Sequence, residues 1–266
     1  MEYGNEDSES LTRRPVDSAP VGMTELQALE QVLSEIVAEG GADAPRRICE
    51  ACVAALPLDR AALTLMTKAD QQEPLWASDD VARELDELQF SLGEGPCVEA
   101  FVSRRPVLVA DLTEHGHALW PVFAAAALRT PVRGLFVLPV QAGAITVGIL
   151  DLYRDTPGML ERDQLAGALR AADAAMWTLL ALLDGVTGYG GLDGEPGVAA
   201  DGRQPVSELH RLEVYQATGM VLEQMQVSPN MALSALRAHA FAHNQTILEV
   251  AREVVVRELR FDKEAP

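Results

Sequence analysis

The amino-acid sequence predicts an α+β domain, in which an antiparallel sheet is flanked by helices, followed by a separate all-helical module. Helical and strand-like patterns alternate up to residue 184, two adjacent β-rich runs form a hairpin pattern, and a glycine-rich stretch precedes three amphipathic helices. With 266 residues the chain is long enough for two modest domains. We expect an α+β domain at 24–184, a linker at 185–205 and a three-helix bundle at 206–261.

Residues 1–23 precede the first periodic pattern and are expected to form a disordered tail. The segment 1–22 carries five acidic residues and two arginines, and it lacks the apolar core of a signal peptide. No run of apolar residues is long enough to span a bilayer, and three cysteines do not make a disulfide framework. These features favour a cytoplasmic protein with reduced thiols and no membrane partner.

The first domain begins with two helices. Thr24 and Gln27 have the spacing of a capping box, and Gly40 is a stop signal after a run with one apolar face. A second helix is expected over Pro45–Ala55. That apolar face of the first helix consists of Leu26, Leu29, Leu33, Ile36 and Val37.

The sheet is predicted from short β-rich runs. A strand at 60–67, a short strand near 74–78 and an amphipathic segment at 79–90 come first. The hairpin then joins runs 133–141 and 144–153 through a turn in which Gly143 supplies a positive φ. A long helix at 161–184 closes the domain, and we expect Gly185 to end it.

Cys97 is the sensor candidate of this domain. In "LGEGPC", Gly93 and Gly95 permit a tight turn and Pro96 suits the first position of a helix, so Cys97 would lie beside unpaired amide donors and have a lowered pKa. The alternative is that Cys97 packs the helix against the sheet, as most unpaired cysteines do. Of these two interpretations the base rate favours packing.

Other candidate ligand residues have simpler explanations. Cys49 and Cys52 have redox or metal-ligand spacing but lie in an alanine-rich helical pattern, which favours packing. Metal-ligand residue types also gather in a segment expected to be a loop, where polar side chains are common, so we predict no metal site. The sequence shows no nucleophile motif, phosphate loop or zinc-protease motif, and therefore we do not expect an enzyme. The loop residues are Asp111, Glu114, His115 and His117.

The C-terminal module is predicted to contain helices at 206–226, 229–244 and 246–259. Ser228 is a cap before Pro229, and Thr246 with Glu249 repeats the capping-box pattern. Apolar residues at helical spacing predict a small three-helix bundle, which by periodicity alone could serve docking or dimerisation. They are Val214, Ala217 and Val221, then Ala232, Ala235, Leu236 and Ala240, then Ile247, Val250, Ala251 and Val254.

Two segments resemble known families. The segment Phe90–Leu112, followed by "LWPVFAAAALRTPVRGLFVLPV" and "GILDLY", resembles the GAF domains of actinobacterial signalling proteins. That resemblance implies a GAF/PAS-like sensor fold and a small-molecule or redox signal, and it identifies no cofactor. "QATGMV", "LRAHAF" and "EVAREVV", from about Leu209 to Leu259, resemble an ANTAR domain, the RNA-binding output module of transcription antitermination regulators.

The second resemblance implies a set of RNA-binding residues. The family's Ala-x-Gly element is matched by Ala217, Thr218 and Gly219, and Arg237 matches an arginine of its second helix. The middle position is often lysine in the family, and Thr218 can offer a hydrogen bond but no cation. We expect an RNA surface formed by Gln216, Thr218, Gly219, Arg237, His239 and His243, with Tyr215 as a further stacking candidate.

Charge leaves an alternative open. The net charge is −19, but Pro205–Pro266 has eight acidic and six basic residues, so the helical module is nearly neutral. Strong acidity normally repels nucleic acid. The sequence therefore predicts a dimeric regulator that binds RNA hairpins under control of a sensor, with a protein-interaction or dimerisation regulator as the alternative.

Overall fold

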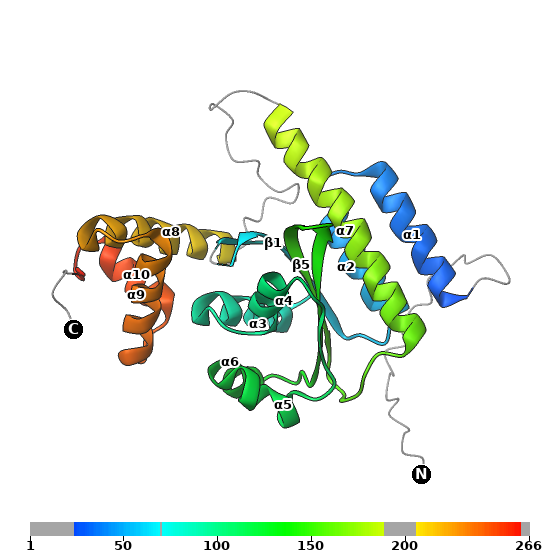
Figure 1. Cartoon of the computed structure of the whole chain (residues 1–266), viewed down its shortest axis with the longest axis horizontal. Helices are drawn as coiled ribbons and strands as arrows, with labels where there is room; N and C mark the ends of the chain where they lie inside the picture. Colours follow the sequence, from blue (N-terminus) through cyan, green and yellow to red (C-terminus); the bar gives the residue numbers. More distant parts are fainter. Residues whose placement is uncertain (1–23, 70, 189–205, 262–266) are drawn as a thin grey trace, which may run out of the picture.

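The computed structural model describes residues 24–69, 71–188 and 206–261 (Figure 1). The expected tail at 1–23 and residues 189–205 of the expected linker lie outside this description. The predicted fold class is confirmed, because a five-stranded antiparallel sheet has the order β2-β1-β5-β4-β3. Its strands are β1 (Arg60–Lys68), β2 (Gln71–Ala77), β3 (Val107–Val109), β4 (Gly134–Ala142) and β5 (Ile145–Arg154).

The hairpin of β4 and β5 forms the middle of the sheet. Gly143 has a φ of 58°, as the tight turn requires. Because side chains alternate along a strand, Leu152 and Asp151 point to opposite faces of the sheet, with Phe136 and Val137 as their respective partners on β4. The two faces therefore bury different kinds of side chain.

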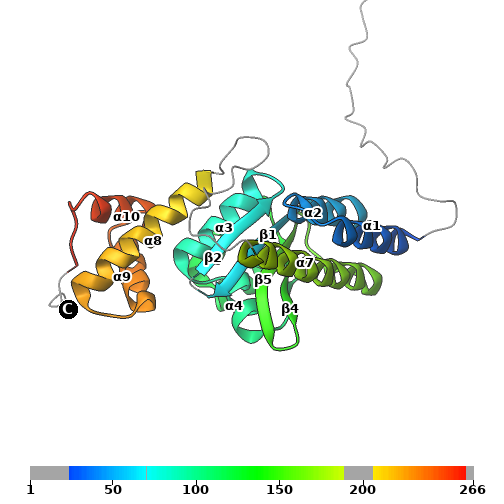
Figure 2. The same ribbon diagram turned by 90° about the horizontal axis from the view of Figure 1, so that it is seen from above.

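Three helices cover one face: α1 (Glu25–Glu39), α2 (Ala44–Ala55) and α7 (Arg162–Gly188) (Figures 1 and 2). The predicted capping box of Thr24 and Gln27 is present. The expectation that Gly185 ends α7 is wrong, because the helix continues to Gly188. A glycine inside a helix costs only about 1 kcal/mol relative to alanine, too little to end a long helix by itself.

One helical segment of the described chain, Arg162–Leu183 in α7, is long and apolar enough to cross a membrane by length and composition. Half of it is buried within the protein. Packing against the sheet and α1 accounts for that apolar character, as in the core helix of a soluble domain.

Four shorter helices cover the other face: α3 (Asp80–Leu92), α4 (Pro96–Ser103), α5 (Leu112–Leu119) and α6 (Pro121–Ala127). The expectation of a loop around His115 is wrong, because α5 occupies that segment. Asp111 caps α5 by accepting a hydrogen bond from the Thr113 amide at 2.8 Å, and Leu112 is fully buried. This local cap and anchor stabilise a helix too short to show a clear period.

The C-terminal module consists of α8 (Val206–Met225), α9 (Pro229–Ala242) and α10 (Ile247–Val255). Ser228 caps α9, and Thr246 with Glu249 forms the predicted capping box. All predicted core positions of the three helices are buried except Ala235, which is half-buried. Phe90 of α3 joins this core, so α3 and the bundle share one apolar cluster.

Candidate nucleic-acid interface

The helical spacing of α8 divides its surface into two sides. The bundle core takes Val214, Ala217 and Val221. A second side carries Arg211, Tyr215 and Thr218, which are spaced by four and three residues. At Arg211 and Tyr215 this side faces β2 and α3. Leu212, Gln216 and Gly219 share another side and are exposed.

The exposed side of α8 is open to a partner. A Cβ atom added at Gly219 would meet no atom within 4 Å. A missing side chain at such a position lets another molecule approach the helix backbone closely. Gln216, one turn earlier on the same side, could donate or accept hydrogen bonds to bases or sugar there.

Thr218, in contrast, is buried with only 8% of its surface exposed. Its hydroxyl donates to the Val214 carbonyl oxygen at 2.7 Å, a bond within α8 itself. Thr218 therefore has no free hydroxyl for RNA in this arrangement.

Arg237 of α9 is half-buried and turned toward α3. Its Nη2 donates to the Phe90 carbonyl oxygen at 2.5 Å, and its guanidinium carbon lies 5.8 Å from the Phe90 ring centroid. Gly93 makes this approach possible, because a Cβ atom there would lie 2.6 Å from Nη1 of Arg237. The predicted RNA-binding cation is thus already engaged by the first domain.

His239 and His243 form a stacked pair near the end of α9. Their ring centroids lie 4.0 Å apart with an interplanar angle of 20°, and the His239 ring also contacts Phe261 edge-on at 5.4 Å. Burial and the neighbouring His243 lower the pKa of His239. The exposed His243 offers a flat ring on which a base could stack.

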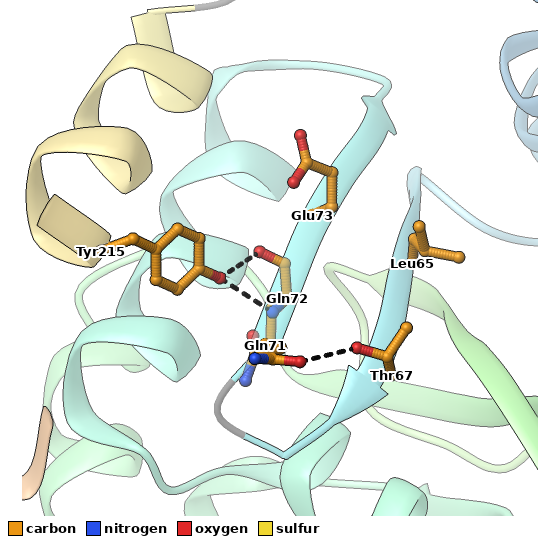
Figure 3. Close-up of a pocket in the computed structure, with 6 residues that line it drawn as sticks. All are labelled: Leu65, Thr67, Gln71, Gln72, Glu73 and Tyr215. Carbon is orange, nitrogen blue, oxygen red and sulfur yellow. Dashed lines mark hydrogen bonds between the residues drawn. The ribbon is translucent and has the colours of Figure 1, made fainter. Parts of the chain in front are cut away.

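Tyr215 bonds to the sheet of the first domain (Figure 3). Its hydroxyl lies 3.0 Å from both the amide nitrogen and the carbonyl oxygen of Gln72 on β2, and its ring meets Phe90 edge-on. The close-up shows the hydroxyl directed at this backbone, over a hollow of about 270 Å³ lined by residues of β1 and β2.

Arg211 is a functional candidate that sequence reasoning missed. Its side chain is 3% exposed; Nη1 donates to the Gln72 carbonyl at 2.8 Å and Nη2 donates to Asp86 Oδ2 at 2.5 Å. Its guanidinium carbon lies 4.5 Å from the Phe90 ring centroid. The helical spacing from Tyr215 could have placed Arg211 on the same side of α8, but no sequence pattern connects it with Asp86.

A cleft of about 910 Å³ separates α3 and α6 from α9 and α10. Glu84, Glu87 and Glu94 line it on the side of the first domain, while Arg237 and Phe241 line it on the side of the bundle. Phe241 is 71% exposed, an aromatic surface that sequence reasoning did not select. In this cleft, carboxylates of the first domain therefore lie across from Arg237 of the predicted RNA surface.

Comparison with family models decides what these two domains are. A model of the GAF domain matches residues 42–177, about half of the chain, and a model of the ANTAR domain matches residues 209–255. The chain belongs to the GAF domain family and carries a C-terminal ANTAR domain. No curated protein matches the chain.

Several solved structures are similar to the first domain, and one of the following three reaches a TM-score of 0.50. The GAF domain of a phosphoenolpyruvate-protein phosphotransferase from Coxiella burnetii is 14% identical with a TM-score of 0.50, covering 62% of this chain and 96% of that chain. The corresponding Acinetobacter domain is 13% identical with a TM-score of 0.49, covering 64% and 100%. A free methionine-R-sulfoxide reductase from Neisseria meningitidis is 14% identical with a TM-score of 0.45, covering 62% and 95%. At these identities the likeness extends to the fold alone.

Cys97 lies inside the GAF domain, with 2% of its surface exposed. Its amide donates to Gln89 Oε1 at 2.7 Å, which satisfies one donor at the start of α4. Burial raises the pKa of the Cys97 thiol well above its ordinary value, so the expectation of a lowered pKa is wrong. The thiol packs as a small apolar side chain, and its role in sensing stays a prediction.

The other candidate ligand residues also have structural explanations. Cys49 and Cys52 are fully buried on α2, which confirms the packing interpretation. Within the described ranges, no three His, Cys, Asp or Glu side chains are grouped so that they could hold a metal ion. The family comparison therefore carries the functional assignment.

Polar groups are nevertheless buried under α3 and α4. Thr64 donates to Asp86 Oδ1 at 2.9 Å. Asp151 on β5 is fully buried, and burial together with Asp86 raises its pKa to about 8, although Gln89 and Tyr153 act in the opposite direction. This side of the GAF sheet holds ionisable groups close to the contact with α8.

Proposed function

We propose that the protein is a signal-responsive transcription antitermination regulator whose ANTAR domain binds RNA hairpins under control of the GAF domain. The observation that carries this proposal is the ANTAR match over 209–255, a range that includes Ala217–Gly219 and Arg237, the residues that match the family's motif. Unpaired loop bases are the part of an RNA hairpin that side chains can read. A regulator of this kind acts in the cytoplasm and is not an enzyme.

The proposed RNA surface contains Gln216, Gly219 and His243, which are exposed, and Arg237, Thr218 and His239, which are half-buried or buried. Gln216 and Gly219 offer hydrogen bonds and close approach, His243 offers stacking, and Arg237 offers the cation. The nearly neutral charge of the module predicts modest affinity per copy, which two copies bound to paired hairpins would raise.

Salt dependence tests the role of Arg237. Arg237→Ala is expected to lower the slope of log affinity against log salt by about one, because one phosphate contact is lost. The slope is a sharper readout than affinity, since the substitution also removes the contact with Phe90. Arg252→Ala is the matched control, because Arg252 is half-exposed on α10 and pairs with Glu213.

The experiment compares a transcript with two terminator-proximal hairpins with a scrambled transcript. A paired-hairpin preference and a slope that changes only in Arg237→Ala would support the proposal. If neither the wild-type protein nor a variant whose ANTAR domain is released from the GAF domain prefers the paired-hairpin transcript, the protein-interaction regulator becomes the better description. Exposed apolar residues of the bundle, Leu212, Met231 and Phe241, favour that second candidate.

We also propose that the protein is a homodimer. Trp177 and Leu169 lie two helical turns apart on α7 and are 63% and 42% exposed, with Val32 of α1 at 40%. These exposed apolar side chains are the residues of α1 and α7 that a second copy could cover, although Asp173 and Arg170 lie between Leu169 and Trp177 along α7. Sedimentation should report a dimer for the wild type and a monomer for Trp177→Glu.

A further inference from the structure

Arg211 has the surroundings of a bound ligand. Its guanidinium is buried between a carboxylate of α3, a carbonyl of β2 and the face of Phe90, all of which belong to the GAF domain. A planar guanidinium that meets a carboxylate and an aromatic face at once is a common mode of specific recognition. The GAF domain thus contains a guanidinium site that the ANTAR domain occupies.

Tyr215 completes the contact by capping the edge of the sheet. β2 is the outermost strand, and an outer strand presents backbone groups without a strand partner. The Tyr215 hydroxyl accepts from the Gln72 amide and donates to the Gln72 carbonyl, each at 3.0 Å. Arg211, one turn earlier, donates to the same carbonyl.

The contact between the two domains depends on a few charged and hydrogen-bonding groups. Apart from the packing of Phe90 into the bundle's apolar cluster, its named interactions are hydrogen bonds and two ion pairs of Arg211, whereas the GAF interior is held by apolar clusters. A buried ion pair adds little net stability, but loss of one partner leaves a buried charge and costs several kcal/mol. Asp86 is the nearer of two carboxylates at Arg211, since Glu87 Oε2 lies 3.8 Å from Nε. Loss of the Asp86 charge should therefore weaken the contact of the ANTAR domain with the GAF domain.

The same region of α3 holds one residue of the predicted RNA surface, whereas Gln216, Gly219 and His243 stay exposed. The residue held is Arg237, which donates to the Phe90 carbonyl oxygen. Glu84, Glu87 and Glu94 line the same cleft as Arg237, against one cation, Arg129, on the side of the first domain, so that side is negative overall and would repel phosphate. A phosphate that takes the guanidinium of Arg237 therefore has to compete with the Phe90 carbonyl and with these carboxylates.

We propose that Arg211 and Tyr215 form a latch that holds the ANTAR domain on the GAF domain and blocks RNA binding until it is released. This proposal rests on the proposed RNA function. It assigns the regulated element to the contact of α8 with Asp86 and Gln72. A signal in the GAF domain would act by weakening that contact.

Asp86→Asn in the full chain tests the latch, with Asp80→Asn as control, because Asp80 lies at the exposed start of the same helix. Asn keeps the shape of Asp86 but removes the charge that pairs with Arg211. We expect amide hydrogen exchange in α8 to become at least about tenfold faster, and affinity for the paired-hairpin transcript to rise by a similar factor. The control should match the wild type in both measurements.

Tyr215→Phe provides a milder variant in case Asp86→Asn unfolds the protein. It keeps the ring against Phe90 and removes the two bonds to Gln72, so a smaller shift in the same direction is expected. Unchanged exchange in α8, or faster exchange with unchanged RNA affinity, would overturn the latch. Faster exchange with no RNA binding by any variant would support the contact and overturn the proposed RNA function instead.

Discussion

The two faces of the GAF sheet are built differently. Under α1, α2 and α7 the sheet buries apolar side chains such as Leu150 and Leu152, two thiols and the Thr178 hydroxyl. Under α3 and α4 it buries Thr64, Asp86, Gln89, Asp151 and Tyr153 among apolar neighbours. The first face is complete within the domain, whereas the second takes a cation, Arg211, from the ANTAR domain.

Asp86 and Asp151 show what this difference means. Both are buried, but Asp86 is paired with Arg211 and bonded to Thr64, whereas burial raises the pKa of Asp151 to about 8. A carboxyl without a nearby cation tends to become neutral, whereas a paired carboxylate can stay charged. The polar face is therefore the part of the GAF domain where a buried carboxylate takes its cation from the other domain.

The largest expected effect concerns the thiols, which lie on both faces. Cys49 and Cys52 on the apolar side and Cys97 on the polar side are all buried with raised pKa values. Alkylation in native buffer should be about a thousandfold slower than in urea for all three, because reaction requires opening. Mass spectrometry of timed samples measures each site, and rapid reaction of Cys97 alone would show that the polar face opens by itself.

Leu152→Asn should separate the two faces next. The side chain enters the apolar face, where an amide finds no partner, and we expect a loss of about 4 kcal/mol in the free energy of unfolding. Leu152→Ile keeps the volume and should cost less than about 1.5 kcal/mol. Urea denaturation measures the free energy of unfolding of both variants. Equal losses would mean that a polar side chain has no extra cost on this face, which would contradict its description as apolar.

Asp151→Asn should stabilise the protein at high pH only. The folded pKa of about 8 lies above the unfolded value of about 3.9, so the folded state binds more protons between these values and wild-type stability falls as pH rises through this window. From pH 4.5 to pH 8 we expect the stability difference to change by about 4 kcal/mol in favour of the variant. Asp173→Asn on the exposed side of α7 is the control, and a difference independent of pH would refute the assignment.

The smallest expected effect is that of Thr64→Val. The substitution removes the donor to Asp86 Oδ1 and should cost about 1 kcal/mol. Thr67→Val, on the exposed part of β1, should change stability by less than about 0.5 kcal/mol. Thermal melting of both variants at neutral pH makes the comparison, and identical midpoints would mean that Asp86 does not depend on Thr64.

The elements that the sequence predicted well have local signals. The capping boxes at Thr24 and Thr246 and the turn at Gly143 depend on residues within four positions of each other, and all three are present. β3, with three residues, and α5, with eight, are too short for a period to show. α5 forms because Asp111 caps it, which is a local interaction, and because Leu112 is buried, which is a tertiary interaction.

The candidate site was predicted only in part, because some of its residues have local signals and others are placed by contacts between distant positions. Periodicity identified the core side of α8, and the family motif selected Gln216, Gly219 and Arg237. No periodicity could show that the Arg211 side of α8 lies against Asp86, because the two residues are 125 positions apart. Phe90 likewise fits a helix of its own domain by sequence, yet it packs in the core of the other.

The connection between the two domains sets how strong their contact has to be. Residues 189–205 join α7 to α8 in one chain, so Arg211 meets the GAF surface at an effective concentration that two separate proteins would reach only in the millimolar range. At such an effective concentration, a contact that would be too weak to hold two separate, dilute proteins together is formed nearly all the time within one chain. Cutting the chain within 189–205 should let the halves separate without any change in the residues that touch.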